Sequence, residues 1–516
     1  MVFLYLFMGA LMISVMSGMS SGIMFVSLWQ MSELSMISDF YSYSFSSLLI
    51  VVSGCVLIWS YYYMSNESNY RRFLSLVCLF ILSMMTLIFI PSMMFSIIGW
   101  DGLGVTSFLL VIYYSNRKSL SSGMLTGLTN RIGDAFFLIA IPFLLFGTSN
   151  MWMNFLFLTL CLTKKAQYPF SSWLPAAMAA PNTVSALVHS STLVTAGLYL
   201  LVRYNFCSNS VLLVLGSLTM MMAGICACAE TDLKKIVALS TLSQLGVMAI
   251  ALGVQSKKIF AFFHLLSHAL FKALLFMCVG VLIHSVFGSQ ESRSYNLLED
   301  NIMGSSSFMI VASTALCGFP FFSGFYSKDS IVENFYMGSP YIFYLLFLSG
   351  IGFTTVYSVK MIFVALGSNK LTEVPILSNS KPRWFVKCPL MILGLLSVTG
   401  GYMMSNKIFF GGVKVVSLDF IQPLVFIISG VFLGIMMSNY HHPNQSNSML
   451  FLTPNFQFSS KFMMKSESSL KLVDSGFMEW GGPSGFSFSS GAMDQFWLIV
   501  TSFLFGPLLG MLLLSL

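Results

Sequence analysis

The sequence predicts an all-α polytopic membrane protein with about 15 transmembrane helices. Of its 516 residues, 56% are hydrophobic and 8% are charged, whereas soluble domains carry roughly 25% charged residues. Apolar runs of about 18 residues or more recur along the chain, each long enough to cross a hydrocarbon core of about 30 Å. Strands of a β-barrel would instead alternate apolar and polar residues. The runs therefore exclude a soluble fold and favour helices, which satisfy their backbone polar groups internally.

The expected spans follow one another with short connections as far as residue 438. Hydropathy places them at 2–28, 45–64, 73–94, 96–115, 124–146, 151–167, 177–204, 211–229, 234–254, 259–285, 307–326, 328–338 with 341–366, 386–404, 420–438 and 495–516. The first span begins at Met1 without a basic leader or a small-residue cleavage site, so we expect a retained helix.

Charge and cysteine usage exclude further classes of protein. The net charge of +7 is spread over single basic residues and pairs, without the run that a nucleic-acid-binding patch needs. Most of the nine Cys residues lie in apolar spans, and Cys226-Ala-Cys228 has the wrong spacing for zinc or thioredoxin chemistry. We therefore expect small buried thiols, with no disulfide and no iron–sulfur cluster.

One long stretch, 440–494, does not read as a span. It is polar and rich in Ser, with scattered charged residues among aromatic residues and Met. Its central part, 456–479, favours an amphipathic surface helix bounded by Pro454 and by Gly481-Gly482-Pro483. A disordered loop is the alternative.

Two apolar segments are interrupted in the same way. The first reads AQYPFSSWLP (166–175) and the second CGFPFFSGFY (317–326), with Pro169-Phe170 and Pro320-Phe321 in equivalent places. Proline removes an intrahelical hydrogen bond, and the freed carbonyl groups survive in a membrane only where protein or water faces them. Paired broken helices are typical of transporters with internal repeats, which are often inverted. The sequence therefore predicts two inverted five-helix repeats, each with a broken helix.

Charged and titratable residues lie within the apolar segments, where each costs on the order of 2.5–3.5 kcal/mol. They are Asp101, Arg131, Asp134, Lys164, Lys165, His189, His264, His268 and Lys272, with Lys328 beside the second interruption. One such residue suits a structural anchor. A mixture of acids, amines and imidazoles spread over many helices is instead what a proton relay needs.

Lysine suits a relay because removal from water favours its neutral form, whereas arginine stays protonated. Asp101 is the expected acidic partner of Lys164. Two unit charges about 7 Å apart interact by roughly 2.4 kcal/mol at an effective dielectric constant of 20. Moving the acid away would therefore discharge the lysine. A static buried ion pair is the alternative for these two residues.

His264, His268 and Lys272 stand at i, i+4 and i+8 in FFHLLSHALFKALLF, so they share one face of a helix. This alignment favours a relay over core histidines with structural partners. A zinc site is the second alternative, but Leu265 stands where a zincin has its Glu, and no third ligand is evident. A haem held by His189 and a histidine of this helix is the third.

The same residues lie in stretches with a specific family pattern. These are GWDGLGVTSFLLVIYY (99–114), NRIGDAFFL (130–138), KKAQYPFSSWLPAAMAAPNTVSALVHSSTLVTAGLYLLVR (164–203), TDLKKIVALSTLSQLGVM (231–248), HLLSHALFKALLFM (264–277) and GFPFFSGFYSKD (318–329). Through them the chain resembles the antiporter-like subunits of respiratory complex I. The hydropathy pattern matches over nearly the whole chain, although the N-terminus looks about one helix shorter than is typical of the family.

The resemblance implies a proton relay at Asp101, Asp134, Lys164, His189, His264, His268, Lys272 and Lys328. Asp101 stands where many members of the family have Glu. Lys164 and Lys328 correspond to the lysines on the two broken helices, and Lys272 corresponds to the central lysine with His264 and His268 as companions.

The resemblance also implies a division of the chain and a place in a larger assembly. The parts are N-terminal transmembrane helices (1–94), two half-channel repeats (95–229 and 230–366), C-terminal helices (367–438), a lateral segment (439–494) and an anchor helix (495–516). No cofactor is expected on this chain, while NADH, FMN, iron–sulfur clusters and ubiquinone belong to other subunits. The expected partners are other membrane subunits, especially the adjacent antiporter-like chain 4, in the mitochondrial inner membrane.

Two other functions stay open at this point. A multisubunit cation/proton antiporter would use nearly the same pore residues. A membrane redox protein with haem between histidines is less favoured. The sequence has no glycine fingerprint for binding NADH, so any oxidation of NADH would occur on other chains. A test of whether the native assembly oxidises NADH would separate the three possibilities.

Overall fold

The computed structural model describes residues 22–29, 32–65, 67–145, 151–204, 209–254, 258–286, 288–292, 303–338, 340–366, 384–408 and 421–437. The predicted lateral segment (439–494) and the predicted last span (495–516) lie outside these residues. Residues 2–21 of the first predicted span also lie outside them.

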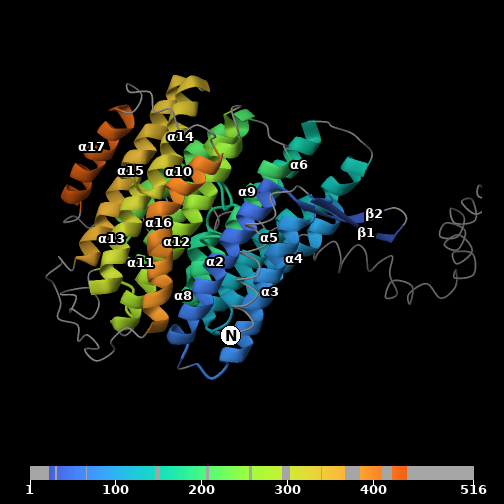
Figure 1. Cartoon of the computed structure of the whole chain (residues 1–516), viewed down its shortest axis with the longest axis horizontal. Helices are drawn as coiled ribbons and strands as arrows, with labels where there is room; N and C mark the ends of the chain where they lie inside the picture. Colours follow the sequence, from blue (N-terminus) through green and yellow to red (C-terminus); the bar gives the residue numbers. More distant parts are fainter. Residues whose placement is uncertain are drawn as a thin grey trace, which may run out of the picture. The chain divides into compact units, whose positions relative to one another are not determined.

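The described residues form helices, apart from one short β-hairpin (Figure 1). The first helices are α2 (Phe40–Tyr63), α3 (Tyr70–Phe89), α4 (Met93–Val111), α5 (Arg117–Leu145) and α6 (Met151–Lys164). Short helices α7 (Trp173–Ala176), η1 (Ala177–Ala179) and α8 (Asn182–Val188) lead to α9 (Leu193–Tyr204), α10 (Asn209–Ala229), α11 (Leu233–Gly253) and α12 (Lys258–Ser285). The last are α13 (Met303–Cys317), α14 (Ser323–Gly338), α15 (Tyr341–Ala365), α16 (Trp384–Ile408) and α17 (Ile421–Met437).

The prediction of a membrane helix over 2–28 is wrong for its last residues. Strand β1 (Gly22–Trp29) pairs antiparallel with β2 (Ser32–Ser38). The sequence of β1, GIMFVSLW, contains β-branched and aromatic residues, which favour strands. A short apolar run of this kind does not distinguish a strand from a buried helix by periodicity.

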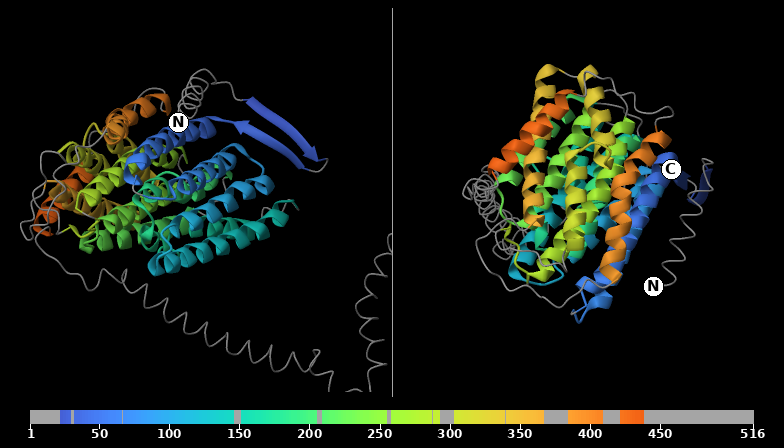
Figure 2. Two further views of the ribbon diagram at one scale, coloured as in Figure 1. Left: turned by 90° about the horizontal axis from the view of Figure 1, so that it is seen from below. Right: turned by 60° about the vertical axis from the view of Figure 1, so that its left-hand side comes forward.

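Long apolar helices make up most of the described chain and lie side by side in both views of Figure 2. Within the described residues, ten helices are long and apolar enough to cross a membrane, and three shorter apolar helices accompany them. The apolar windows of α11 and α12 are completely buried. Helix α12 contacts α2, α8, α11, α13, α14 and α16. A polytopic helical membrane fold is therefore confirmed, and α12 forms its core.

Both predicted interruptions occur, and the two helices that precede them end in the same backbone motif. After α6 and after α13 the chain turns with a residue in the left-handed region, Ala166 (φ 55°) and Gly318 (φ 84°). The hydrogen bonds join Gln167 N to Leu162 O (3.2 Å), Ala166 N to Thr163 O (3.4 Å), Phe319 N to Thr314 O (3.2 Å) and Gly318 N to Ala315 O (3.2 Å). These pairs define a Schellman motif at each helix end.

The helix ends leave carbonyl groups that side chains then satisfy. The Trp173 indole Nε1 donates to Thr163 O at 3.0 Å after α6. The Lys328 ammonium donates to Leu316 O at 2.5 Å after α13. Each broken segment therefore folds back on the end of the helix before it, which brings Lys328 to the second interruption.

Gly324 should not tolerate a side chain. A Cβ atom at this position would lie 1.8 Å from the carbonyl oxygen of Ala315, and a backbone atom cannot swing away. Gly324→Ala should therefore force α13 and α14 apart and destabilise the fold by about 1–3 kcal/mol. Thermal unfolding of the detergent-solubilised protein measures this effect. The matched control is Gly304→Ala in α13, where no atom lies within 4 Å of the added Cβ; equal stability of the two variants would contradict this packing.

Candidate functional site

Helices α4, α5 and α6 bring four charged side chains into one row. Arg131 lies between the two acids, with its Nη1 atom 3.0 Å from Asp101 Oδ1 and 3.6 Å from Asp134 Oδ2. The other carboxylate oxygen of Asp134 lies 3.9 Å from Lys164 Nζ. The charges therefore alternate in sign from the exposed Asp101–Arg131 pair to the buried lysine.

Lys164 is completely buried at the last residue of α6. Its Nζ atom donates a hydrogen bond to the Trp100 carbonyl oxygen (2.5 Å) and lies 3.9 Å from the centroid of the Trp100 ring. The carbonyl and the ring face both favour a cation, and so does the C-terminus of a helix. Lys164 is thus held at a junction of α4, α5 and α6.

The predicted partnership of Asp101 with Lys164 differs from the arrangement in the structure. Asp134 is the acid within ion-pair distance of Lys164, while Asp101 pairs with Arg131. The sequence placed Arg131 inside an apolar segment but gave it no role in the relay. The signal was present, because Arg131 and Asp134 stand at i and i+3 in NRIGD and so share a helix face.

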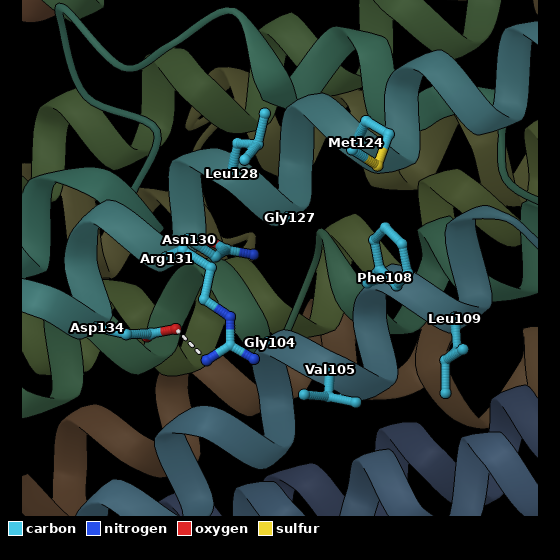
Figure 3. Close-up of a pocket in the computed structure, with 10 residues that line it drawn as sticks. All are labelled: Gly104, Val105, Phe108, Leu109, Met124, Gly127, Leu128, Asn130, Arg131 and Asp134. Carbon is cyan, nitrogen blue, oxygen red and sulfur yellow. Dashed lines mark ion pairs between the residues drawn. The ribbon is translucent and has the colours of Figure 1, made fainter. Parts of the chain in front are cut away.

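A groove of about 360 Å³ lies between α4 and α5, beside these charges (Figure 3). Apolar residues line most of it, and Asn130, Arg131 and Asp134 stand together at one part of the wall. The Arg131 side chain is 60% exposed and that of Asp101 is 47% exposed. Large apolar residues around them are also exposed, including Val105 and Leu128. The outer face of α4 and α5 therefore combines an apolar surface with an exposed ion pair.

His189 lies in the interior and stands between Lys164 and Lys272 in the sequence. It follows the last residue of α8, is buried, and has its ring centroid 6.3 Å from that of Trp173. Neither ring nitrogen has a hydrogen-bond partner among the described residues. Lys234, which the sequence did not assign to the relay, is also buried and donates to Ala180 O at 3.3 Å. Lys234 stands at the first residue of the expected span 234–254, where a lysine at a helix end is ordinary, so its position gave no signal.

The predicted common face of α12 is supported by its contacts with α11. Lys272 Nζ donates to Ser240 Oγ at 2.5 Å, and His264 Nε2 lies 3.1 Å from Gln244 Oε1. His268, between them, is buried without a hydrogen bond to a described residue, and its ring is 6.4 Å from that of His264. Within the described chain, no carboxylate lies within 4 Å of Lys272. Lys272 thus differs from Lys164 in having a neutral partner.

The second interruption joins this cluster through α14. Ser327 Oγ lies 2.9 Å from His264 Nδ1, and the next residue is the buried Lys328. Cys317 Sγ contacts Ser358 Oγ at 2.7 Å close to the same helix end. Asp329, which the sequence did not single out, has a buried Oδ2 atom without a hydrogen bond to a described residue.

The structure therefore gathers the predicted residues into two clusters. The first contains Asp101, Asp134 and Lys164, and the second contains His264, His268, Lys272 and Lys328. Among the described residues, no hydrogen bond or ion pair joins His189 to either cluster. The described residues also contain no group of three His, Cys, Asp or Glu side chains placed to hold a metal ion. The chemistry that these side chains offer is the binding and release of protons.

The chain matches a family model described as "NADH:quinone oxidoreductase/Mrp antiporter, TM" over residues 90–354. NADH-ubiquinone oxidoreductase chain 5 of Aedes aegypti is 41% identical over 472 residues, which cover 87% of this chain and 81% of that protein. The chain 5 protein of Lumbricus terrestris is 41% identical over 499 residues, with coverage of 88% and 85%.

Two solved structures share the fold. A chain of the Mrp complex from a Dietzia species has a TM-score of 0.78 and 20% identity, covering 99% of this chain and 59% of that chain. A chain of an archaeal membrane-bound sulfane sulfur reductase, a respiratory membrane complex, has a TM-score of 0.70 and 18% identity, with coverage of 84% and 92%.

The helical fold and its buried lysines thus define an antiporter-like membrane subunit. The extent of the matches then settles the family: the chain belongs to the NADH:quinone oxidoreductase/Mrp antiporter family, among the NADH-ubiquinone oxidoreductase chain 5 proteins.

Proposed function

We propose that this subunit of NADH:ubiquinone oxidoreductase, respiratory complex I, translocates protons along the two clusters and His189. Asp101, Arg131, Asp134 and Lys164 control the first half, and Lys272, His268, His264 and Lys328 form the second. The redox chemistry of the complex, with NADH, FMN, iron–sulfur clusters and ubiquinone, lies on other subunits. The observation that carries the proposal is the burial of three lysines, Lys164, Lys272 and Lys328, inside a membrane bundle.

Water is the expected link between the side chains of the path. Buried polar groups in native proteins pair with protein groups or with ordered water. His189 and His268 are buried, and neither ring nitrogen of either residue bonds to a described protein group. Within the described part of the chain this leaves water as the partner that we propose. Such water would bridge the first cluster to His189, and would also bridge His268 to Lys272.

The two clusters also support the proposal of two repeats, over 95–229 and 230–366. Each region contains one helix that ends in a Schellman motif before a proline, α6 in the first and α13 in the second. Each interruption has a lysine beside it, Lys164 and Lys328. An inverted relation of the two regions would open one half of the path to each side of the membrane.

We further propose that the outer face of α4 and α5 packs against the adjacent antiporter-like chain 4 in the mitochondrial inner membrane. A charged side chain is costly to expose to acyl chains. The exposed Asp101–Arg131 pair lies on a face that is otherwise apolar, so a neighbouring subunit with a polar group at this depth fits it better than lipid. This contact would place the charged residues of the first cluster beside the next subunit.

The proposal is tested with Lys272→Met in the assembled complex in sealed vesicles. Proton transfer through this subunit should fall on the order of a hundredfold, because the buried base is lost. The complex should therefore oxidise NADH while moving fewer protons per NADH. The matched control is Lys387→Met on the exposed surface of α16, which should leave the ratio unchanged.

An unchanged number of protons moved per NADH in Lys272→Met would refute the proposed proton path. The Mrp complex chain is 20% identical to this chain, so its likeness supports the fold alone and not an antiporter function. A native assembly that exchanges cations for protons without oxidising NADH would favour that alternative.

A further inference from the structure

The two ring nitrogens of His264 have different neighbours. Nδ1 lies 2.9 Å from the hydroxyl of Ser327, on the side of Lys328. Nε2 lies 3.1 Å from Gln244 Oε1 on α11. All three side chains are buried. One nitrogen therefore faces a hydroxyl, which can pass a proton on, and the other faces an amide.

A third helix fixes the orientation of the Gln244 amide. Its Nε2 atom donates to the Tyr357 hydroxyl of α15 at 3.4 Å. That hydroxyl lies 2.9 Å from Ser243 Oγ, and Ser243 gives its own proton to the backbone carbonyl of Ser240 at 3.0 Å. The Tyr357 proton therefore goes to Ser243, and Tyr357 accepts from Gln244. The amide nitrogen is held toward Tyr357, which leaves the amide oxygen toward His264.

The hydrogen bonds around Ser327 leave its proton for His264. The Ser267 hydroxyl has two acceptors within reach, Ser327 Oγ at 3.0 Å and the His264 backbone carbonyl at 3.1 Å. The proton of Ser327 is then available for His264 Nδ1, which is closer than its backbone acceptors Gly324 O (3.3 Å) and Ser323 O (3.4 Å). Because an amide oxygen only accepts, neutral His264 carries its proton on Nε2 and a lone pair on Nδ1.

We propose that Gln244 and Tyr357 are positioning residues that restrict His264 to proton exchange at Nδ1, through Ser327. A histidine that passes protons through its ring takes one on at one nitrogen and releases one from the other. Here Ser327 gives its proton to Nδ1, which yields the imidazolium, as its oxygen takes up a proton from water of the proposed path. The reverse transfer breaks the same Nδ1–H bond and returns a proton to that water, while the Nε2–H bond stays intact. His264 thus serves the second half of the path as a proton store, which Ser327 joins to the route between Lys272 and Lys328. This inference rests on the proposed function.

Glu in place of Gln244 makes the sharpest test, because a carboxylate can hold or exchange the Nε2 proton. The titratable groups around the site are His268 and Lys272 on α12, Lys328 on α14, Tyr357 on α15 and Cys317 at the end of α13. Among the described residues, no titratable side chain of α2, α8, α9 or α16 acts on His264. A new pH dependence of pumping in Gln244→Glu can therefore be assigned to the introduced carboxyl group.

Pumping by Gln244→Glu should fall at neutral and alkaline pH, where the carboxylate retains the proton of His264, and recover as the pH falls and the carboxyl becomes neutral. Gln244→Met should be impaired at every pH. Pumping by Tyr357→Phe should fall about fivefold, the effect of one neutral hydrogen bond. The double variant with Gln244→Met and Tyr357→Phe should lose as much pumping as Gln244→Met alone. Thr354→Val is the matched control on α15, because Thr354 bonds within its own helix.

The readout is protons moved per NADH in vesicles, at several pH values, with NADH oxidation as the measure of assembly. Normal pumping in Gln244→Met, or identical pH profiles for Gln244→Met and Gln244→Glu, would overturn the inference. Additive losses for Gln244 and Tyr357 would overturn the role of Tyr357. These outcomes concern the inference alone when Lys272→Met loses pumping, whereas normal pumping in Lys272→Met overturns the proposed function itself.

Discussion

Replacement of Lys164 with Met should leave an assembled complex that oxidises NADH but loses nearly all proton transfer through this subunit. Met has a similar length and suits a buried site, so the main structural loss is the hydrogen bond to the Trp100 carbonyl, about 1–3 kcal/mol for an unsatisfied buried group. The chemical loss is larger. The path then lacks the base that takes up and releases the proton, and transfer should fall on the order of a hundredfold.

Lys164→Arg separates charge from proton release. The guanidinium keeps a positive charge beside Asp134, but it does not release a proton at accessible pH. Both variants should therefore lower the number of protons moved per NADH in sealed vesicles. Lys118→Met provides the matched control, because Lys118 is an exposed lysine in the first turn of α5. A normal ratio in Lys164→Met, or an active Lys164→Arg, would show that Lys164 is not a base of the path.

The sequence predicted features that depend on local chemistry. Pro169 and Pro320 identified both interruptions, because proline ends a helix wherever it lies in the fold. The spacing of His264 and Lys272 placed them toward one neighbouring helix, and both indeed contact α11. Hydropathy located the long helices because the bilayer sets their length.

The missed features depend on packing between distant segments. Tyr357 and Gln244 are neutral and lie 113 residues apart, so no hydropathy or charge pattern connects them. Asp101 and Asp134 were both recognised, but which acid lies nearer Lys164 depends on the rotation of α4 and α5 about their axes. Strand β1 was missed because the largely apolar run GIMFVSLW is compatible with a helix as well as with a strand.

Asp134 and Lys164 should show strongly non-additive effects on pumping. The two charges lie 3.9 Å apart, and at an effective dielectric constant of 20 their attraction is about 4 kcal/mol. Asp134→Asn removes this attraction, so Lys164 should release its proton too early and the cycle should stall. Once Lys164 is Met, loss of the acid should add little, because this half of the path is already silent.

A double-mutant cycle with Asp134→Asn and Lys164→Met measures this coupling as pumping rate, and we expect about 0.5–3 kcal/mol. The sequence predicts the same switch for Asp101, and a second cycle with Asp101→Asn tests that prediction. Because Arg131 lies between Asp101 and Asp134, the effect of Asp101 should reach Lys164 through them and give the smaller coupling. Asp101→Glu should be almost silent, since it retains the charge opposite Arg131. Simple addition of the losses in both double-mutant cycles would show that the acids and the lysine act independently. A larger coupling for Asp101 would mean that Arg131 moves aside and that Asp101 reaches Lys164 directly during pumping.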